Sequence, residues 1–273
     1  MMEKKSTKIL VRLIAVALIA VMLMSGLTAF ADVDNGRIEN AKDMAELVYK
    51  GYNKGAQGPI SITQGKLYYK NSRNYQDVYV VALSGTEVAT EACLNQSTFI
   101  LTDLFAGFNL DNAYYHNVVQ AICQLDEGSK LILAGHSLGG MVAQQVASDP
   151  TIKAKYDVLY TVTFGSPLLS VGRREGKTVR LGDWTDVVPY LSINTLATPI
   201  QTLVGLTRAH GTYLNPISSH MKSYARCNVW KKYDALGNYK GTASAKGYWV
   251  QLDRGTQRFY PSPAFDISCF KGF

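Results

Sequence analysis

The chain has 273 residues, 47% of them hydrophobic and 18% charged, with a formal net charge of +7. This is ordinary globular composition, sufficient for one large domain or two small ones. No internal repeat or low-complexity tract interrupts the chain, and no basic block of the kind that nucleic-acid-binding proteins carry follows its first residues, so we expect no nucleic-acid partner.

Residues 1–31 have the pattern of a secretory signal peptide. A basic start precedes the apolar run Leu13 to Met24, and Ala29-Phe-Ala31 has the small-x-small pattern of a cleavage site. We expect cleavage between Ala31 and Asp32, which leaves residues 32–273 as a secreted, extracellular chain with 24 basic and 20 acidic residues. The alternative is an uncleaved membrane anchor, because the apolar stretch is nearly long enough to cross a bilayer. No later stretch is long and apolar enough to do so.

The first element expected after this segment is an amphipathic helix over Ala41 to Tyr52. Alternating apolar residues then predict paired strands over Ile60 to Ile62 and Lys66 to Tyr69, on either side of Gly65. The next run, Val78 to Leu83, is apolar throughout, which is typical of a central strand.

From residue 111 onward, helical and extended patterns alternate. They predict a helix over Asp111 to Leu125, a strand over Lys130 to Ala134, a helix over Met141 to Ala147, and strands over Val158 to Phe164 and Thr178 to Leu181. This order indicates an α/β fold, with a central, mostly parallel sheet flanked by helices. Beyond residue 228, short alternating runs such as Tyr248 to Leu252 predict a hairpin-rich C-terminal appendage of the same domain.

Residues 131–140, LILAGHSLGG, contain the pattern G-x-S-x-G centred on Ser137. A serine hydroxyl is a poor nucleophile at neutral pH, so a hydrolase presents it beside a base and close to fixed amide donors. The pattern achieves this on a strained turn between a strand and a helix, and both elements are predicted here. We therefore expect Ser137 to be the nucleophile of a serine hydrolase. The alternative is a tight glycine turn with an incidental serine.

Several segments, in the same order, resemble the class 3 (fungal-type, GHSLGG) lipase family of the alpha/beta-hydrolase superfamily. They are Val80 to Thr86, similar to the family's strand ending in F-R-G-T/S, Thr102-Asp-Leu104, Thr163-Phe-Gly-Ser-Pro167, and Asp183-Trp-Thr-Asp-Val-Val-Pro189, similar to D-x-V-P. The resemblance covers about Val80 to Tyr224 and implies an alpha/beta-hydrolase domain over residues 32–273. It places the catalytic acid at Asp186, with Asp183 as the alternative.

The chain differs from the family at two points. Leu83-Ser84 replaces the family's phenylalanine-arginine pair, so the support that the arginine gives to the oxyanion loop is missing or supplied elsewhere. The spacing from the acid to the histidine is also short.

The remaining site residues follow from the chain order serine, acid, histidine of these hydrolases. Only His210 and His220 follow Asp186, and His220, with a tyrosine four residues later, resembles the family's histidine segment. We assign His220 as the base and keep His210 as the alternative. The oxyanion donors expected are the backbone N–H groups of Leu138 and Thr86.

The activity expected is that of an exported carboxylic-ester hydrolase, a lipase that cleaves acylglycerol-type lipid esters at a lipid-water interface through an acyl-Ser137 intermediate. It needs no cofactor or metal, and its partner is the lipid or other ester substrate. Two alternatives remain: an esterase for non-lipid esters of the feruloyl type, and a non-catalytic binding protein on the same scaffold. Apolar stretches over Val88 to Leu110 and Leu191 to Ser219 are expected to form a lid or acyl pocket, or else core.

Four cysteines lie beyond the signal segment, at positions 93, 123, 227 and 269. No C-x-x-C pair occurs among them, so a zinc ribbon or a thioredoxin-like redox site is not expected. Four cysteines allow three pairings, of which proximity in sequence favours Cys93 with Cys123 and Cys227 with Cys269. The alternative is four free thiols.

Overall fold

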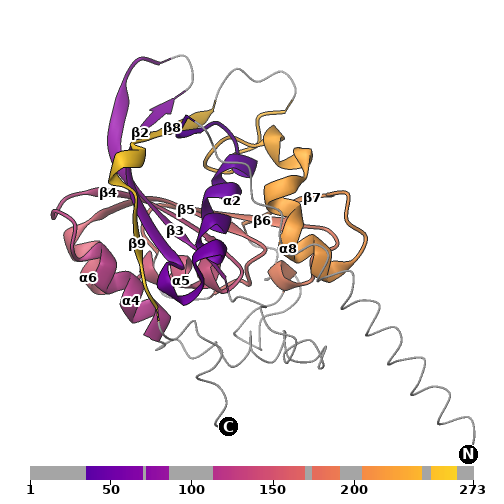
Figure 1. The fold of residues 1–273 in the computed structure, drawn as a ribbon. Coiled ribbons are helices and arrows are strands. Elements are labelled where there is room, and N and C mark those ends of the chain that lie inside the picture. Colours follow the sequence, from indigo (N-terminus) through magenta and orange to yellow (C-terminus); the bar gives the residue numbers. More distant parts are fainter. Residues whose placement is uncertain are drawn as a thin grey trace, which may run out of the picture.

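The computed structural model describes residues 35–69, 72–85, 113–169, 174–190, 205–241 and 247–262. These residues form a mixed α/β fold, in which helices cover both faces of one central sheet (Figure 1). The predicted signal peptide lies outside the described residues. Among the helices of the described ranges, none has the length and apolar character needed to cross a membrane.

Within the described ranges the sheet has nine strands, and its central part is parallel. The strands in spatial order are β1 (Arg37–Ile38), β8 (Tyr248–Leu252), β2 (Ile60–Tyr69), β3 (Tyr75–Leu83), β4 (Lys130–His136), β5 (Asp157–Phe164), β6 (Lys177–Asp183) and β7 (Leu206–Ala209), with β9 (Arg258–Tyr260) paired to the start of β2. Strands β3 to β7 are parallel to one another, whereas the pairs β1–β8, β8–β2, β2–β9 and β2–β3 are antiparallel. The predicted parallel central sheet is therefore confirmed.

Two expectations about strands are corrected. Strand β2 is continuous from Ile60 to Tyr69, because Gly65 pairs with Val78 on one side and with Leu252 on the other. The expected C-terminal appendage is wrong, because β8 pairs with β1 and β2, and β9 pairs with β2. The buried side chains of Val250 and Leu252 join the main core, which explains why this late segment belongs to the central sheet.

Helices of two groups cover opposite faces of the sheet. One face carries α2 (Ala41–Tyr49) and α8 (Pro216–Arg226), and the other carries α4 (Ala113–Ile122), α5 (Leu138–Val146) and α6 (Pro150–Lys155). Short 3-10 helices follow several elements: η1 (Lys50–Gln57), η2 (Val188–Tyr190), η3 (Asn228–Lys232) and η4 (Arg254–Thr256). Helix α8, which the sequence analysis did not predict, begins with Asn215 as its cap and Pro216 at its first position.

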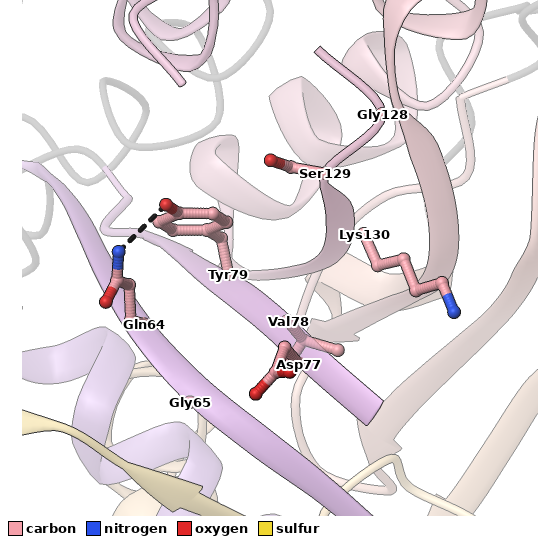
Figure 2. Close-up of a pocket in the computed structure, with 8 residues that line it drawn as sticks. All are labelled: Gln64, Gly65, Asp77, Val78, Tyr79, Gly128, Ser129 and Lys130. Atoms are coloured by element: carbon pink, nitrogen blue, oxygen red, sulfur yellow. Dashed lines mark hydrogen bonds between the residues drawn. The ribbon is translucent and has the colours of Figure 1, made fainter. Parts of the chain in front are cut away.

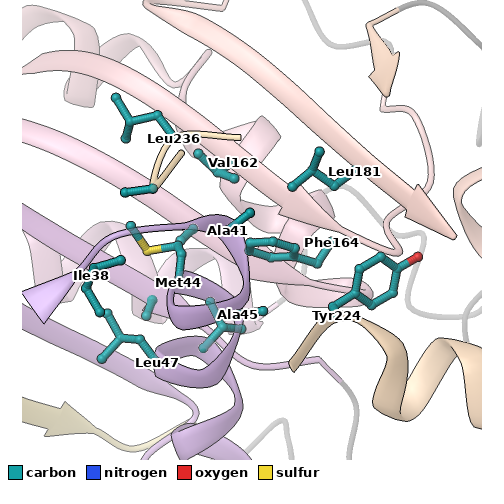
Figure 3. Close-up of a cluster of buried hydrophobic side chains, with 14 of the residues drawn as sticks. Ile38, Ala41, Met44, Ala45, Leu47, Val162, Phe164, Leu181, Tyr224 and Leu236 are labelled. Atoms are coloured by element: carbon teal, nitrogen blue, oxygen red, sulfur yellow. The ribbon is translucent and has the colours of Figure 1, made fainter. Parts of the chain in front are cut away.

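Both faces of the central strands are buried, which explains their uninterrupted apolar runs. On β3, Val80 and Ala82 join the core beneath α2 and α8, whereas Val81 and Leu83 join the core beneath α4 and α5. Figure 3 shows the first of these cores, in which Met44 and Ala45 of α2 lie close to Phe164 and Tyr224. This packing holds α8 against the sheet.

The described part of the chain has a polar pocket at the end of the sheet where β4 begins. Its volume is about 500 Å³, and it is lined by Gln64, Gly65, Asp77, Val78, Tyr79, Gly128, Ser129 and Lys130 (Figure 2). Ser137, by contrast, follows the last residue of β4. Ser137 and Asp186 therefore lie away from this pocket, just beyond the carboxyl ends of β4 and β6, where ligands of open α/β sheets bind.

Candidate active site

Ser137 stands in a strained backbone conformation between β4 and α5. Its φ is 54° and its ψ is −123°, and it is the only non-glycine residue of the described ranges with a positive φ. Such a conformation costs on the order of 1–3 kcal/mol and persists only where the surrounding structure imposes it. The predicted strand and helix flank it on both sides. The strain is thus placed at the residue expected to be the nucleophile.

The turn is possible because the chain passes very close to the end of β3. A Cβ on Gly139 would lie 2.3 Å from the carbonyl oxygen of Leu83 and 2.5 Å from that of Ser84. Any larger side chain at this position would force the two backbones apart. The second glycine of the G-x-S-x-G pattern therefore has a steric reason in this fold.

The structure brings together the three residues predicted as nucleophile, base and acid. Nε2 of His220 lies 3.0 Å from Oγ of Ser137, and Nδ1 lies 2.9 Å from Oδ2 of Asp186. Because a carboxylate only accepts, the proton of the neutral imidazole is on Nδ1, and Nε2 accepts from the serine hydroxyl. All three side chains are nearly inaccessible: Ser137 is 4% exposed, His220 6% and Asp186 0%.

Asp186 is held by donors other than His220. Its Oδ1 accepts from the backbone N–H of Val188 at 2.9 Å, and its Oδ2 accepts from the hydroxyl of Tyr224 at 2.7 Å. Burial, and then the charge of Asp186, raise the pKa of Tyr224 well above its usual value, so the hydroxyl stays protonated and donates. The tyrosine four residues after His220 therefore orients the acid, a role that the sequence pattern did not assign to it.

The two alternative residues lie elsewhere. Asp183 is buried, and its carboxylate accepts from the backbone N–H groups of Thr185 and Gly211 and from the hydroxyl of Ser223. These bonds tie the end of β6 to the segment after β7 and to α8. His210 is exposed just beyond β7. The geometry therefore favours Asp186 and His220 over Asp183 and His210.

Of the two predicted oxyanion donors, one lies within the described residues. Leu138 is the first residue of α5, where a backbone N–H has no acceptor within the helix. Thr86 lies outside the described residues. The residue before it, Gly85, passes directly beside Ser137, because a Cβ on Gly85 would lie 2.7 Å from Cβ of Ser137.

Three hydroxyl groups support the backbone at Ser84 and Gly85, the segment in which the sequence analysis noted a missing arginine. The hydroxyl of Tyr114 donates to the carbonyl of Ser84 at 2.9 Å, and the Ser84 hydroxyl donates to the carbonyl of Val48, also at 2.9 Å. The hydroxyl of Tyr52 accepts from the N–H of Gly85 at 2.8 Å. The backbone at Ser84 and Gly85 is therefore held by groups from α2, η1 and α4, which no local sequence pattern connects to it.

His136, the residue before the nucleophile, is completely buried beneath the site. Its Nδ1 lies 2.6 Å from the hydroxyl of Tyr52, and its Nε2 lies 3.0 Å from the carbonyl oxygen of His220. Burial, and then the proximity of His220, lower the pKa of His136 well below 6.5. The imidazole is therefore neutral in the folded protein at neutral pH.

This burial predicts a pH dependence of stability. Below about pH 6.5 the unfolded chain protonates His136 while the folded protein does not, so the stability present above that pH is lost as the pH falls. The contribution is up to about 1.4 kcal/mol per pH unit. The His136→Gln variant, which is neutral throughout, is expected to show a shallower decline in the free energy of unfolding between pH 7 and pH 5. Urea unfolding at both values measures this, and equal declines in the two proteins would contradict the prediction.

The described cysteines form no disulfide. Cys123 is exposed and Cys227 is buried, and neither is bonded to a described residue. The sulfur of Cys227 lies 3.4 Å from both N and Oγ1 of Thr212. Cys93 and Cys269 lie outside the described residues. Within the described ranges, no cluster of three or more histidine, cysteine or acidic side chains is arranged to hold a metal ion.

The stretches expected to form a lid or pocket lie mostly outside the described residues. Residues 88–110 and 191–204 fall there, whereas Leu206 belongs to β7 and pairs with Arg180 of β6. Leu206 is thus part of the sheet.

Comparison with known proteins finds no counterpart: no family model matches the chain, and neither does a curated protein or a solved structure.

Proposed function

We propose that this chain is a serine hydrolase that cleaves carboxylic esters through an acyl intermediate on Ser137. The observation that carries the proposal is the continuous hydrogen-bonded series from Ser137 through His220 to Asp186, which begins at a serine in a strained strand-to-helix turn. A nucleophile, a base and a group that orients the base are the three parts that nucleophilic catalysis by serine requires.

Each side chain has a definite part in the proposed reaction. As the Ser137 oxygen attacks the ester carbonyl, Nε2 of His220 takes its proton, and Asp186 stabilises the imidazolium through Nδ1. The N–H of Leu138 faces the developing oxyanion, and the predicted second donor is Thr86. His220 then returns the proton to the departing alcohol. A water molecule repeats these steps on the acyl-enzyme and releases the acid.

Lipid esters are the substrate class that we favour. Trp184 and Val187, on either side of Asp186, are 58% and 48% exposed, and Leu214, shortly before α8, is 83% exposed. Large apolar side chains in water around the acid and base segments fit an apolar acyl chain or a lipid surface better than a polar substrate. The proposal also includes export of the chain after cleavage behind Ala31.

An active-site probe and a substrate panel test the proposal. A fluorophosphonate is expected to label the folded protein at one residue, Ser137, identified by mass spectrometry of the labelled peptide. Lack of labelling in folded protein would contradict the hydrolase proposal and favour a binding protein. Among p-nitrophenyl acyl esters and glycerides, hydrolysis is expected to extend to long acyl chains. Activity confined to feruloyl-type esters would contradict the lipid assignment alone.

A further inference from the structure

One buried histidine has no part in the proposed reaction, although it lies next to the nucleophile. The ring of His136 packs against the rings of Tyr49 and His220, with centroids 4.8 Å and 4.6 Å apart. Both of its nitrogens are hydrogen-bonded to groups on other elements. Apolar groups of the same shape can replace a buried pair of hydrogen-bonded groups with little change in stability. The hydrogen bonds of His136 therefore call for a reason other than stability.

The direction of each hydrogen bond follows from the chemistry of the partners. The carbonyl of His220 only accepts, so the proton of His136 is on Nε2. Nδ1 of the neutral ring is then an acceptor, and the hydroxyl of Tyr52 donates to it. The oxygen of the same hydroxyl accepts from the N–H of Gly85. One oriented series of hydrogen bonds therefore runs from Gly85 through Tyr52 and His136 to the backbone of His220.

This series joins the two segments whose relative position matters most in a serine hydrolase. Gly85 precedes Thr86, the predicted oxyanion donor, and His220 is the proposed base. The two segments lie 135 positions apart by their numbers in the chain. Rates of attack respond to errors of about 1 Å in the placement of such groups, with losses of about 100-fold.

We propose that Tyr52 and His136 are positioning residues, which fix the oxyanion segment relative to the backbone of the base through this series of hydrogen bonds. The inference rests on the proposed function. Neither side chain takes a proton from Ser137 or contacts the ester. Both act through the backbone groups that they hold.

Two variants remove links of the series while keeping most of the packing. Tyr52→Phe keeps the ring but loses the hydroxyl that bonds Gly85 and His136. His136→Gln keeps an N–H near the carbonyl of His220, but its amide oxygen does not occupy the position of Nδ1, to which Tyr52 donates. For each variant, kcat and KM are measured on a water-soluble short-chain ester, together with the rate at which a fluorophosphonate labels Ser137. We expect kcat and the labelling rate to fall about 10- to 100-fold, with KM changed by less than about 2-fold.

Tyr156→Phe is the matched control. Like Tyr52, which is half-buried, Tyr156 links two elements through its hydroxyl, because it donates to the backbone carbonyl of Leu125 at 3.1 Å. It is buried in the core beneath α4 to α6, away from the site. Its loss is expected to lower the melting temperature while kcat stays unchanged. Equal kcat values for Tyr52→Phe and Tyr156→Phe would overturn the proposal.

A double-mutant cycle adds a readout that general destabilisation does not mimic. If the two residues act in one series, Tyr52→Phe combined with His136→Gln is expected to lose little more kcat than the worse single variant. Losses that multiply would overturn the proposal. Should Tyr52→Phe fail to fold, a kcat of His136→Gln equal to that of the wild type would overturn it as well. Failure of the wild-type protein to be labelled at Ser137 would instead contradict the proposed function.

Discussion

Ser137→Ala is expected to lower kcat for ester hydrolysis by about 10⁶-fold, the loss known when a serine nucleophile of this kind is removed. The variant has no hydroxyl to attack the carbonyl, while Leu138 and the rest of the site still bind the ester, so KM is expected to change little. Kinetics on a soluble ester measure both constants. Alanine also carries a Cβ, so it takes the same strained φ of 54° at the same cost as serine. The melting temperature is therefore expected to stay within a few degrees of that of the wild type.

Ser148→Ala is the control for this substitution. The Ser148 hydroxyl donates to the carbonyl of Gln145 just beyond α5, so it is a serine of the same region with no link to His220. It is expected to keep wild-type kcat and fluorophosphonate labelling. Residual hydrolysis by Ser137→Ala above about one hundredth of the wild-type rate would mean that another group is the nucleophile.

Asp186→Asn is expected to lower kcat by about 10⁴-fold. The amide can donate to Nδ1 of His220, which favours the tautomer with its proton on Nε2. In that tautomer Nε2 cannot accept the proton of the Ser137 hydroxyl. His220 and Tyr224 both contact Oδ2, so the amide nitrogen takes that place and can also donate to the Tyr224 oxygen. The amide oxygen, in the place of Oδ1, can still accept from the N–H of Val188, so the fold is expected to persist. Kinetics and circular dichroism on the same preparation separate the loss of catalysis from loss of structure.

Asp183→Asn distinguishes the two aspartates. Its carboxylate accepts from Gly211, Thr185 and Ser223 but has no contact with His220, so the variant is expected to lose stability and to keep kcat within about 10-fold of the wild type. A loss of kcat at Asp183 as large as that at Asp186 would show that the acid has been assigned wrongly.

Local sequence patterns were sufficient to predict the strand and the helix on either side of Ser137. The apolar strand ending at His136, the serine and the helix from Leu138 are neighbours in the chain, and each has a periodicity that can be recognised without its partners. The same holds for β3 and β5, whose apolar runs reflect burial on both faces. The resemblance to the class 3 lipases narrowed the predicted acid to Asp183 or Asp186, and the chain order of such hydrolases narrowed the predicted base to His210 or His220.

The place of the C-terminal strands depended on contacts between distant segments. The run Tyr248 to Leu252 alternates in the same way whether it forms a separate hairpin or joins a larger sheet, because alternation reports only that one face is buried. Its partners, β1 and β2, lie about 180 or more positions earlier by number. For the same reason the sequence analysis predicted two strands on either side of Gly65 in place of the continuous β2. The pairing of Gly65 with Leu252 cannot be recognised from the sequence near either residue.

By itself, then, the sequence determined the parallel centre of the sheet and the strand-to-helix turn at Ser137, because both arise from short-range periodicity and sterics. Only the tertiary structure shows that Asp186 and His220, rather than Asp183 and His210, lie in a hydrogen-bonded series with Ser137, since this depends on contacts between distant elements. It also brings the side chains of Tyr224, Tyr52 and His136 into hydrogen-bond contact around this series. A tyrosine hydroxyl carries no sequence signature of its partner, and only the packing of α2, η1 and α8 around the end of β4 places these groups together.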